Sequence, residues 1–165
     1  MGIMDLDQQR TKSNEGLVKI FFEFVDKNSP IASESLWAEP AGTDLYRLRN
    51  IPFYVYGFSE NDIVNVQEKE GRLVVKRVVE RGGHSTYRIF LAEGTTEEKF
   101  SIDWIPLKRL GCFYERATRR LVAVDVPPGV DVYAVYAALE KGEKDKLWEF
   151  EEAHYARPLR DSRIQ

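Results

Sequence analysis

Cysteine is almost absent from this chain, which has one among its 165 residues. A single thiol excludes a disulfide framework and any cysteine-rich zinc or iron–sulfur site. The 11 glycines and 7 prolines are too few for a collagen-like repeat. We therefore expect no metal and no cofactor, and we expect Cys112 to be a reduced thiol.

Neither a dominant charge nor a long apolar run is present. The 24 basic and 27 acidic side chains give a net charge of −3, which is no footprint for nucleic acid or an anionic membrane. Apolar stretches such as Ile20–Val25 are far shorter than the roughly 18 residues of a membrane helix. Residues 1–16 also lack the apolar core of a signal peptide. These absences predict a cytoplasmic protein with no membrane partner.

The chain has enough apolar surface to fold, because 43% of its residues are hydrophobic and 12% are aromatic. Its length predicts one domain or two small subdomains packed together. We expect four segments: a flexible N-terminus over 1–16, a β-rich subdomain over 17–83, a second subdomain over 84–157 and a flexible tail over 158–165.

The first subdomain consists of short runs rich in β-branched and aromatic residues, separated by turn signals. Gly71 can supply the positive φ of a tight hairpin turn. The pattern predicts a small bent β-sheet or partly open barrel, with strands at Val18–Val25, Glu34–Glu39, Leu45–Leu48, Phe53–Phe58, Asp62–Gln67 and Arg72–Glu80.

In the second subdomain strands alternate with helices. Thr95 and Glu98 fit a capping box, Pro106 must kink or restart the helix that follows, and Gly111 ends it. Asp131 caps a second helix that stops at Gly142. With strands at Thr86–Leu91, Cys112–Glu115, Leu121–Val126 and Leu147–Tyr155, the order is βαββαβ, the ferredoxin-like plan. The predicted fold class is α+β.

Several motifs carry a resemblance over residues 17–155. They are ESLWAE at 34–39, NIPFYVYG at 50–57, DIV at 62–64, RVVERGGHSTYR at 77–88 and LGCFYE at 110–115. Together they resemble a bacterial family of small proteins defined only as a domain of unknown function, and so imply no activity. LGCFYE, VAVDVPP and WEFEE in the C-terminal half are also distantly similar to ferredoxin-like regulators that bind and restrain ribonucleases.

The loop over 82–88 is the segment whose side chains best suit ligand binding or catalysis. His84, Ser85 and Arg88 offer an imidazole, a hydroxyl and a guanidinium, which together suit an anion. The alternative is ordinary turn chemistry, in which the hydroxyls satisfy nearby backbone and His84 bonds the neighbouring strand. A catalytic pair of His84 and His154 is disfavoured because nothing in the spacing brings them together, and the surroundings of Cys112 are those of a buried hydrophobe.

Basic residues gather between Arg72 and Arg88, where five cations and one acid give a local charge of +4. Arg77 and its neighbours suit phosphates, and exposed Tyr54, Tyr56 or Tyr87 would suit base stacking. This is the basis of an RNA-binding alternative.

Aromatic residues concentrate at Trp37 and in the segment from Asn50 through Tyr54 to Tyr56. Where they project outward they make a protein-docking surface, since Trp, Tyr and Arg dominate interface hot spots. The acidic run 140–152 carries six acids and three lysines and can mimic the phosphates that a basic partner expects.

The sequence thus favours a non-enzymatic binding protein whose partner is another protein. The best interpretation is an inhibitor or immunity-type protein that occludes a toxin or nuclease. An RNA-binding regulatory module is the alternative, and an enzyme that uses the His84 loop is the third hypothesis.

Overall fold

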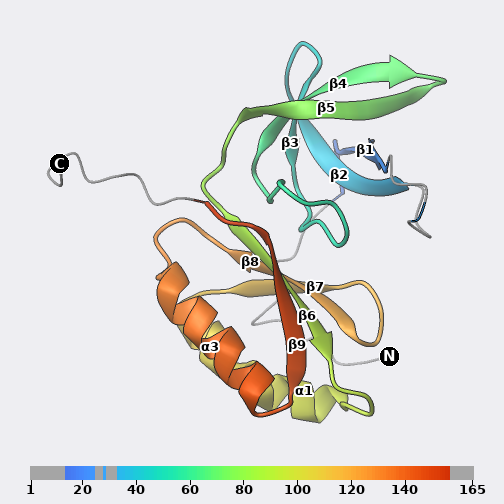
Figure 1. Cartoon of the computed structure of the whole chain (residues 1–165). Helices are drawn as coiled ribbons and strands as arrows, with labels where there is room; N and C mark the ends of the chain where they lie inside the picture. The colour runs from blue at the N-terminus through green and yellow to red at the C-terminus, as the bar shows by residue number, and fades with distance from the viewer. Residues whose placement is uncertain (1–13, 25–27, 29–32, 157–165) are drawn as a thin grey trace, which may run out of the picture.

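A computed structural model describes residues 14–24, 28 and 33–156. The predicted flexible ends, 1–16 and 158–165, lie outside the described residues except for residues 14–16. The chain builds two layers of structure along one axis: a barrel of strands β1–β5, and below it a sheet of strands β6–β9 backed by helices (Figure 1). The fold is a mixed α/β arrangement in which strands predominate.

The barrel contains β1 (Val18–Glu23), β2 (Ser33–Gly42), β3 (Leu45–Leu48), β4 (Ile63–Lys69) and β5 (Arg72–Glu80). Consecutive strands pair antiparallel, and β1 meets β5 in parallel where Phe21 faces Val74. The ring is therefore closed, whereas a bent sheet or partly open barrel was expected. Register shifts in the β2–β3 and β4–β5 pairs bend the strands enough to close it.

The β4–β5 hairpin confirms the turn predicted at Gly71. Glu70 and Gly71 have φ values of 51° and 77°, both in the left-handed region. Two central residues with positive φ match the twist of paired strands, which is why Gly is favoured at such turns.

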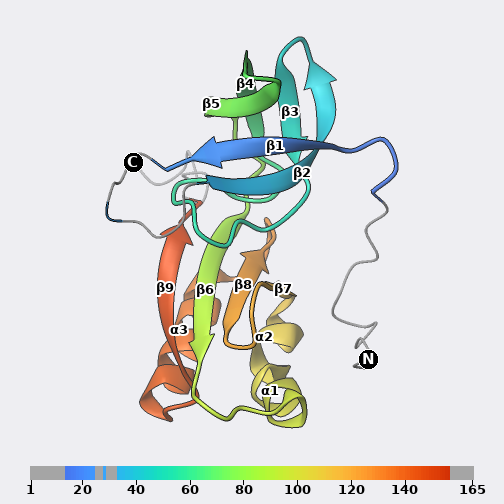
Figure 2. The same cartoon turned by 90° about the vertical axis from the view of Figure 1, so that its right-hand side faces the viewer.

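The second half contains β6 (Ser85–Leu91), α1 (Glu97–Asp103), α2 (Ile105–Leu110), β7 (Phe113–Arg116), β8 (Leu121–Val126), α3 (Val132–Lys144) and β9 (Trp148–His154). The strands form one antiparallel sheet in the order β7-β8-β6-β9. All three helices cover the same face of this sheet (Figure 2). Within the described ranges no helix is long and apolar enough to cross a membrane.

The strand predicted at 53–58 is wrong. This segment belongs to an irregular connection between β3 and β4. The buried carboxylate of Glu34 accepts hydrogen bonds from the backbone N–H groups of Phe53, Tyr54 and Val55 at 2.7 to 3.3 Å. These donors are satisfied by a side chain, so the aromatic, β-branched composition of the segment does not lead to a strand.

Two of the predicted helix boundaries, Thr95 and Gly142, need correction. Thr96, rather than Thr95, caps α1, because its hydroxyl accepts the N–H of Lys99 while the Thr95 hydroxyl donates to the Ala92 carbonyl. Gly142 does not stop α3, which continues through Lys144. A Cβ on Gly142 would lie 2.2 Å from the Trp148 ring, so this glycine allows close packing within the helix. Asp131 does cap α3, as predicted.

Two apolar clusters form the core, one in each half. The barrel cluster is built from Ile20, Phe22, Leu36, Ala38, Leu48, Val64 and Val66. The other, between the sheet and its helices, includes Tyr87, Phe100, Trp104, Leu107, Leu139 and Trp148. Between them lies a polar seam of buried side chains, made of Glu34, Ser59, Asp62, His84, Thr86, Arg88 and Asp125. This seam is where the loop motifs of the sequence are found.

Candidate functional site

The His84 side chain is buried in the seam. Its Nδ1 lies 2.7 Å from Oδ1 of Asp125 on β8, and its Nε2 lies 3.1 Å from the Asn61 amide nitrogen. With Nδ1–H donating to the carboxylate, Nε2 accepts from the amide. The ring is thus hydrogen-bonded on both sides within the molecule, as the turn-chemistry alternative expects.

Ser85 and Arg88 are also buried and bonded internally. The Ser85 hydroxyl accepts the N–H of Ala156 at 2.9 Å. The Arg88 guanidinium, 2% exposed, donates to Glu151 and to the carbonyls of Tyr54 and Val55. The two terminal nitrogens of Arg88 therefore hold the irregular connection against β6, while its Nε bonds β9 through Glu151. The three residues proposed as an anion site do not form an open one.

Glu34 anchors the same connection from the barrel side. Burial raises the pKa of its carboxyl, and the three backbone donors and nearby Arg88 partly oppose that rise. The Ile51 N–H in turn donates to Glu115 on β7 at 3.0 Å. Carboxylates from both halves thus fix a connection that has no regular structure of its own.

The other predicted docking residues lie on or beside this connection. Trp37 is half-buried on the outside of β2, and the Lys19 ammonium lies 5.2 Å from its ring centroid. The backbone N–H of Trp37 donates to the side-chain oxygen of Asn50. Tyr54 is half-buried. Tyr56 is 59% exposed, its hydroxyl donates to Glu151 at 2.6 Å, and its ring lies 4.6 Å from Arg88. Only Tyr56 among these projects far into solvent.

The basic hairpin is less free than its sequence indicates. Arg81 donates to the Gly57 carbonyl and to buried Asp62. Arg88 donates to Glu151 and to two backbone carbonyls, as described above. Arg72 lies over the Phe21 ring, while Arg77 is exposed on β5. Tyr87, one of the residues considered for base stacking, is buried at 1% exposure. Of the three tyrosines considered for base stacking, the structure therefore removes Tyr87 and leaves Tyr56 exposed beside Arg88.

His154 lies in the seam, where its ring hydrogen-bonds the backbone of His84, so the fold brings together two residues that sequence spacing left apart. Its Nδ1 lies 3.0 Å from the Ser59 hydroxyl, which lies 2.5 Å from the Thr86 hydroxyl. Burial is the main cause that lowers the pKa of His154, and the positive charge of Arg81 adds to it. Ser59 is wholly buried, so this cluster joins the two halves without forming an open site.

Cys112 is buried, and burial raises the pKa of its thiol to about 12. Such a thiol is a structural residue, because nucleophiles need an accessible thiolate. Over residues 14–24, 28 and 33–156 no group of three or more His, Cys, Asp and Glu side chains is arranged to hold a metal ion.

An open surface lies instead where α3 runs beside β9. We call it the α3–β9 strip: Tyr133, Tyr136, Glu140, Glu143, Phe150, Glu152 and Tyr155. The helical members are spaced i, i+3, i+7 and i+10, so they share one face of α3. Tyr136 packs edge-on against Phe150 with ring centroids 5.4 Å apart, and the Tyr155 hydroxyl lies 3.4 Å from that of Tyr133. Tyr133 is 71% exposed and Tyr136 42% exposed.

Sequence reasoning found the acidic run 140–152 but missed the tyrosines of the strip. The available signal was the spacing of Tyr133, Tyr136 and Glu140, which places them on the helical face next to that of the apolar residues Val132, Val135 and Leu139. That β9 would lie next to this face depends on the tertiary fold. Glu149, Glu151 and Glu152 divide between the two faces of β9 as alternation predicts, because the β6–β9 register shifts only after Glu152, at Ala153.

No curated protein matches this chain. A solved structure described as a novel crystal structure of a hypothetical protein from Neisseria gonorrhoeae is similar in fold, with a TM-score of 0.74 and 17% sequence identity. The match covers 86% of this chain and 97% of that one. The model of a family described as domain of unknown function DUF4265 matches residues 34–150. The chain therefore belongs to the DUF4265 family, in agreement with the resemblance that its motifs carry.

Proposed function

We propose that this protein is a non-catalytic binding protein that occludes a basic surface of another protein, as an inhibitor or immunity-type protein does in the cytoplasm. The α3–β9 strip is its docking surface. The observation that carries the proposal is the composition of this surface, which joins four aromatic rings to the three carboxylates of Glu140, Glu143 and Glu152, with Lys144 on the same helical face one turn after Glu140.

Exposed tyrosines beside carboxylates suit a cationic partner. Arg and Lys side chains bind carboxylates and also stack on the faces of aromatic rings. Tyrosine supplies a large contact area at low conformational cost and is enriched at binding hot spots. Carboxylates around the rings increase the association rate and reject acidic partners.

The chemistry of the buried loop supports the same choice. His84, Ser85 and Arg88, on which the enzyme hypothesis depends, are satisfied by groups of the chain itself. Two of the cations on which the RNA hypothesis depends, Arg81 and Arg88, are likewise committed. A ligand at either place would have to displace hydrogen bonds of buried groups, whereas Glu143 and Glu152 of the strip are exposed and keep further acceptor positions open to solvent.

A ferredoxin-like assignment of the second half is part of the proposal. The element order from β6 to β9, with α1 and α2 counted as one helical connection, supports a βαββαβ unit. In such a unit one sheet face carries the helices and the sheet has two edges. The strip lies at the β9 edge, next to α3.

The test is capture from a lysate of the source bacterium with three immobilised proteins: wild type, the double variant Glu140→Lys/Glu143→Lys, and the control Glu98→Lys. Glu98 is an exposed residue of α1, away from the strip. Wild type and the control are expected to retain the same basic protein in stoichiometric amount, and the double variant to lose it.

Mass spectrometry identifies the retained protein, and an ultraviolet ratio detects nucleic acid. Equal retention by all three proteins would contradict the strip as the docking surface. Retention of RNA that Arg77→Glu abolishes would replace the proposal with the RNA-binding alternative.

A further inference from the structure

Strand β9 is an edge strand, with β6 on one side and, in the described residues, no strand on the other (Figure 2). Along an antiparallel strand, the backbone groups of successive residues point alternately toward the paired strand and away from it. The Phe150 N–H points outward, because it donates to the Glu143 carboxylate at 3.2 Å. By the same alternation, the N–H and C=O groups of Trp148 and Glu152 face the open side.

The open edge has a defined extent. At its upper end the Ala153 carbonyl accepts the N–H of Gly57, so the irregular connection already occupies the edge there. Below that point a carboxylate oxygen of Glu143 accepts the Phe150 N–H. It takes the place that a backbone carbonyl of a neighbouring strand would occupy. The edge is therefore available over Trp148–Glu152, with one acceptor that can swing away.

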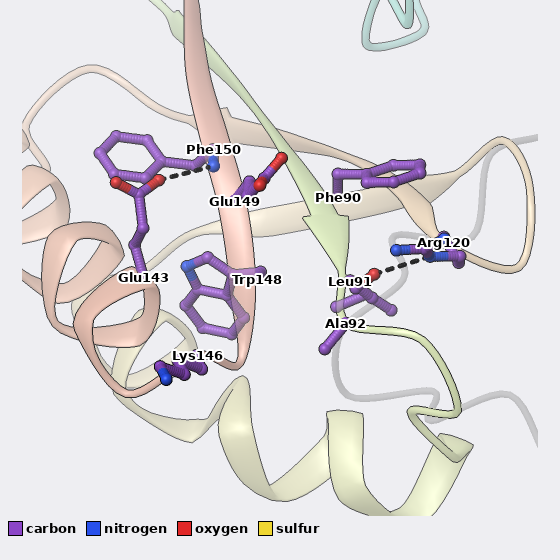
Figure 3. A pocket seen from close by; sticks show the side chains of 9 residues that line it. All are labelled: Phe90, Leu91, Ala92, Arg120, Glu143, Lys146, Trp148, Glu149 and Phe150. Carbon is purple, nitrogen blue, oxygen red and sulfur yellow. Dashed lines mark hydrogen bonds between the residues drawn. The ribbon is translucent and has the colours of Figure 1, made fainter.

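A hollow of about 770 Å³ lies where β6 ends and β9 begins (Figure 3). It is lined on the side of α3 and β9 by Glu143, Lys146, Trp148, Glu149 and Phe150, and across from them by Phe90 of the paired strand β6 and by Arg120. The Arg120 guanidinium stacks over Phe90 at 4.2 Å, which fixes that wall. An extended segment along β9 thus has space for side chains beside the strand.

A second copy of this chain does not fit the edge. Antiparallel pairing of two β9 strands about Phe150 sets Glu149 of each copy opposite Glu151 of the other. Like charges directly opposite across a ladder are destabilising. Each copy would also bring Glu143 and Glu152 to the interface between the two β9 strands, so self-pairing accumulates negative charge.

A basic strand avoids this repulsion, because its cations are attracted by the carboxylates that repel a second copy. Glu149 carries an exposed carboxylate on the helix-free side of β9, and Glu143 and Glu152 lie on the strip side. A segment with Lys or Arg at alternate positions meets carboxylates on one face, while its intervening side chains meet Phe150 and Tyr136 on the other.

We infer that the partner docks by strand addition: a basic, extended segment of the partner protein pairs with the open edge of β9 over Trp148–Glu152. The inference rests on the proposed function and specifies how the strip holds its partner. Main-chain hydrogen bonds supply the binding, and carboxylates on both sides of β9 select a cationic segment.

The experiment uses a fluorescein-labelled peptide of alternating Lys and Val, together with the same peptide N-methylated at every second residue on the edge that would pair with β9. Methylation removes the donors of one edge and leaves every charge in place. Fluorescence anisotropy with the full chain is expected to show about tenfold weaker binding of the methylated peptide, the loss of one or two interstrand hydrogen bonds. Hydrogen exchange is expected to show slower exchange of the Glu152 amide only with the unmethylated peptide.

The outcomes separate the inference from the function on which it rests. Equal affinity of both peptides overturns strand addition and leaves charge-based docking at the strip in place. No binding of either peptide, while lysate capture still depends on Glu140 and Glu143, also overturns strand addition alone. Failure of both the peptides and the capture overturns the function as well. The control Glu98→Lys is expected to bind both peptides as wild type does.

Discussion

The two halves of the molecule differ from the seam that joins them in the kind of interaction that holds each together. The barrel is filled by small aliphatic side chains and one Phe, and the sheet half by a larger cluster that includes Trp104 and Trp148. Between them, Glu34, Asp62, Arg88 and Asp125 are buried at no more than 6% exposure. Two apolar cores therefore lie on either side of a layer of buried charged residues.

This difference shows which interactions fix the orientation of one half relative to the other. Apolar contacts are non-directional, so two apolar surfaces can slide or rotate at small cost. Hydrogen bonds of a buried charge are directional, and losing one partner leaves the other desolvated. Every buried side-chain nitrogen or oxygen in the described ranges has a partner. The seam thus sets the angle between the halves, and the cores supply the stability.

The largest expected effect comes from weakening each core in turn. Leu48→Ala in the barrel and Leu139→Ala in the sheet half should each cost about 2–5 kcal/mol of unfolding free energy, because both leucines are fully buried. Urea unfolding followed by circular dichroism measures this loss. If the seam couples the halves, each variant unfolds in a single transition. Two transitions in either variant would show that the halves are independent.

Breaking the seam at Arg88 is the next largest effect. Arg88→Ala leaves the carbonyls of Tyr54 and Val55 without their donor and removes a buried partner of half-exposed Glu151, at a cost of about 3 kcal/mol. Unlike the core variants, it should separate unfolding into two steps, which calorimetry resolves. The control Arg88→Lys keeps the charge without the planar fork and should fall between. A single transition at wild-type stability would mean that the seam does not set the coupling.

Gly142→Ala tests packing within the sheet half alone. The added Cβ would meet the Trp148 ring at 2.2 Å, so we expect a loss of about 1–3 kcal/mol although Ala is the better helix former. The double variant Gly142→Ala/Trp148→Phe should lose less than the sum of its single changes, because the smaller ring makes room. Thermal unfolding of the four proteins gives the coupling energy. Additive losses would rule out the steric explanation.

The smallest expected effect is a pH dependence of the seam. The pKa of His154 is lowered from an ordinary value of 6.5, mainly by burial. The unfolded chain therefore binds the proton first, and stability is lost as pH falls through the window below 6.5. Urea unfolding at pH 7.5 and 5.5 should show this loss in wild type and a smaller one in His154→Gln. The raised pKa of Glu34 acts in the opposite direction, since it favours the fold as pH falls.

Local signals predicted the elements that depend on their own residues. The hairpin at Glu70–Gly71, the Asp131 cap and the αL residue Gly111 after α2 follow from backbone preference within a few residues. The segment 53–58 and Gly142 were misjudged because their partners, Glu34 and Trp148, are distant in sequence. Local propensity cannot show that a remote carboxylate will satisfy three amides.

The candidate site follows the same division. Tyr56 stands out in the sequence and is exposed, but His84, Ser85 and Arg88 looked available only because their partners Asp125, Ala156 and Glu151 could not be known. The α3–β9 strip has a helical half that spacing can reveal. Its other half depends on which strand lies beside the helix, and that is a property of the whole sheet.

The one cysteine gives the molecule an internal reporter. Because the Cys112 thiol is buried and its pKa is raised to about 12, a thiol reagent at neutral pH reacts only when the surrounding structure opens. Cys112 belongs to the core of the sheet half, so its labelling rate follows the opening of that half and not of the barrel. Labelling kinetics, without any engineered residue, thus follow the opening of the sheet half separately from that of the barrel.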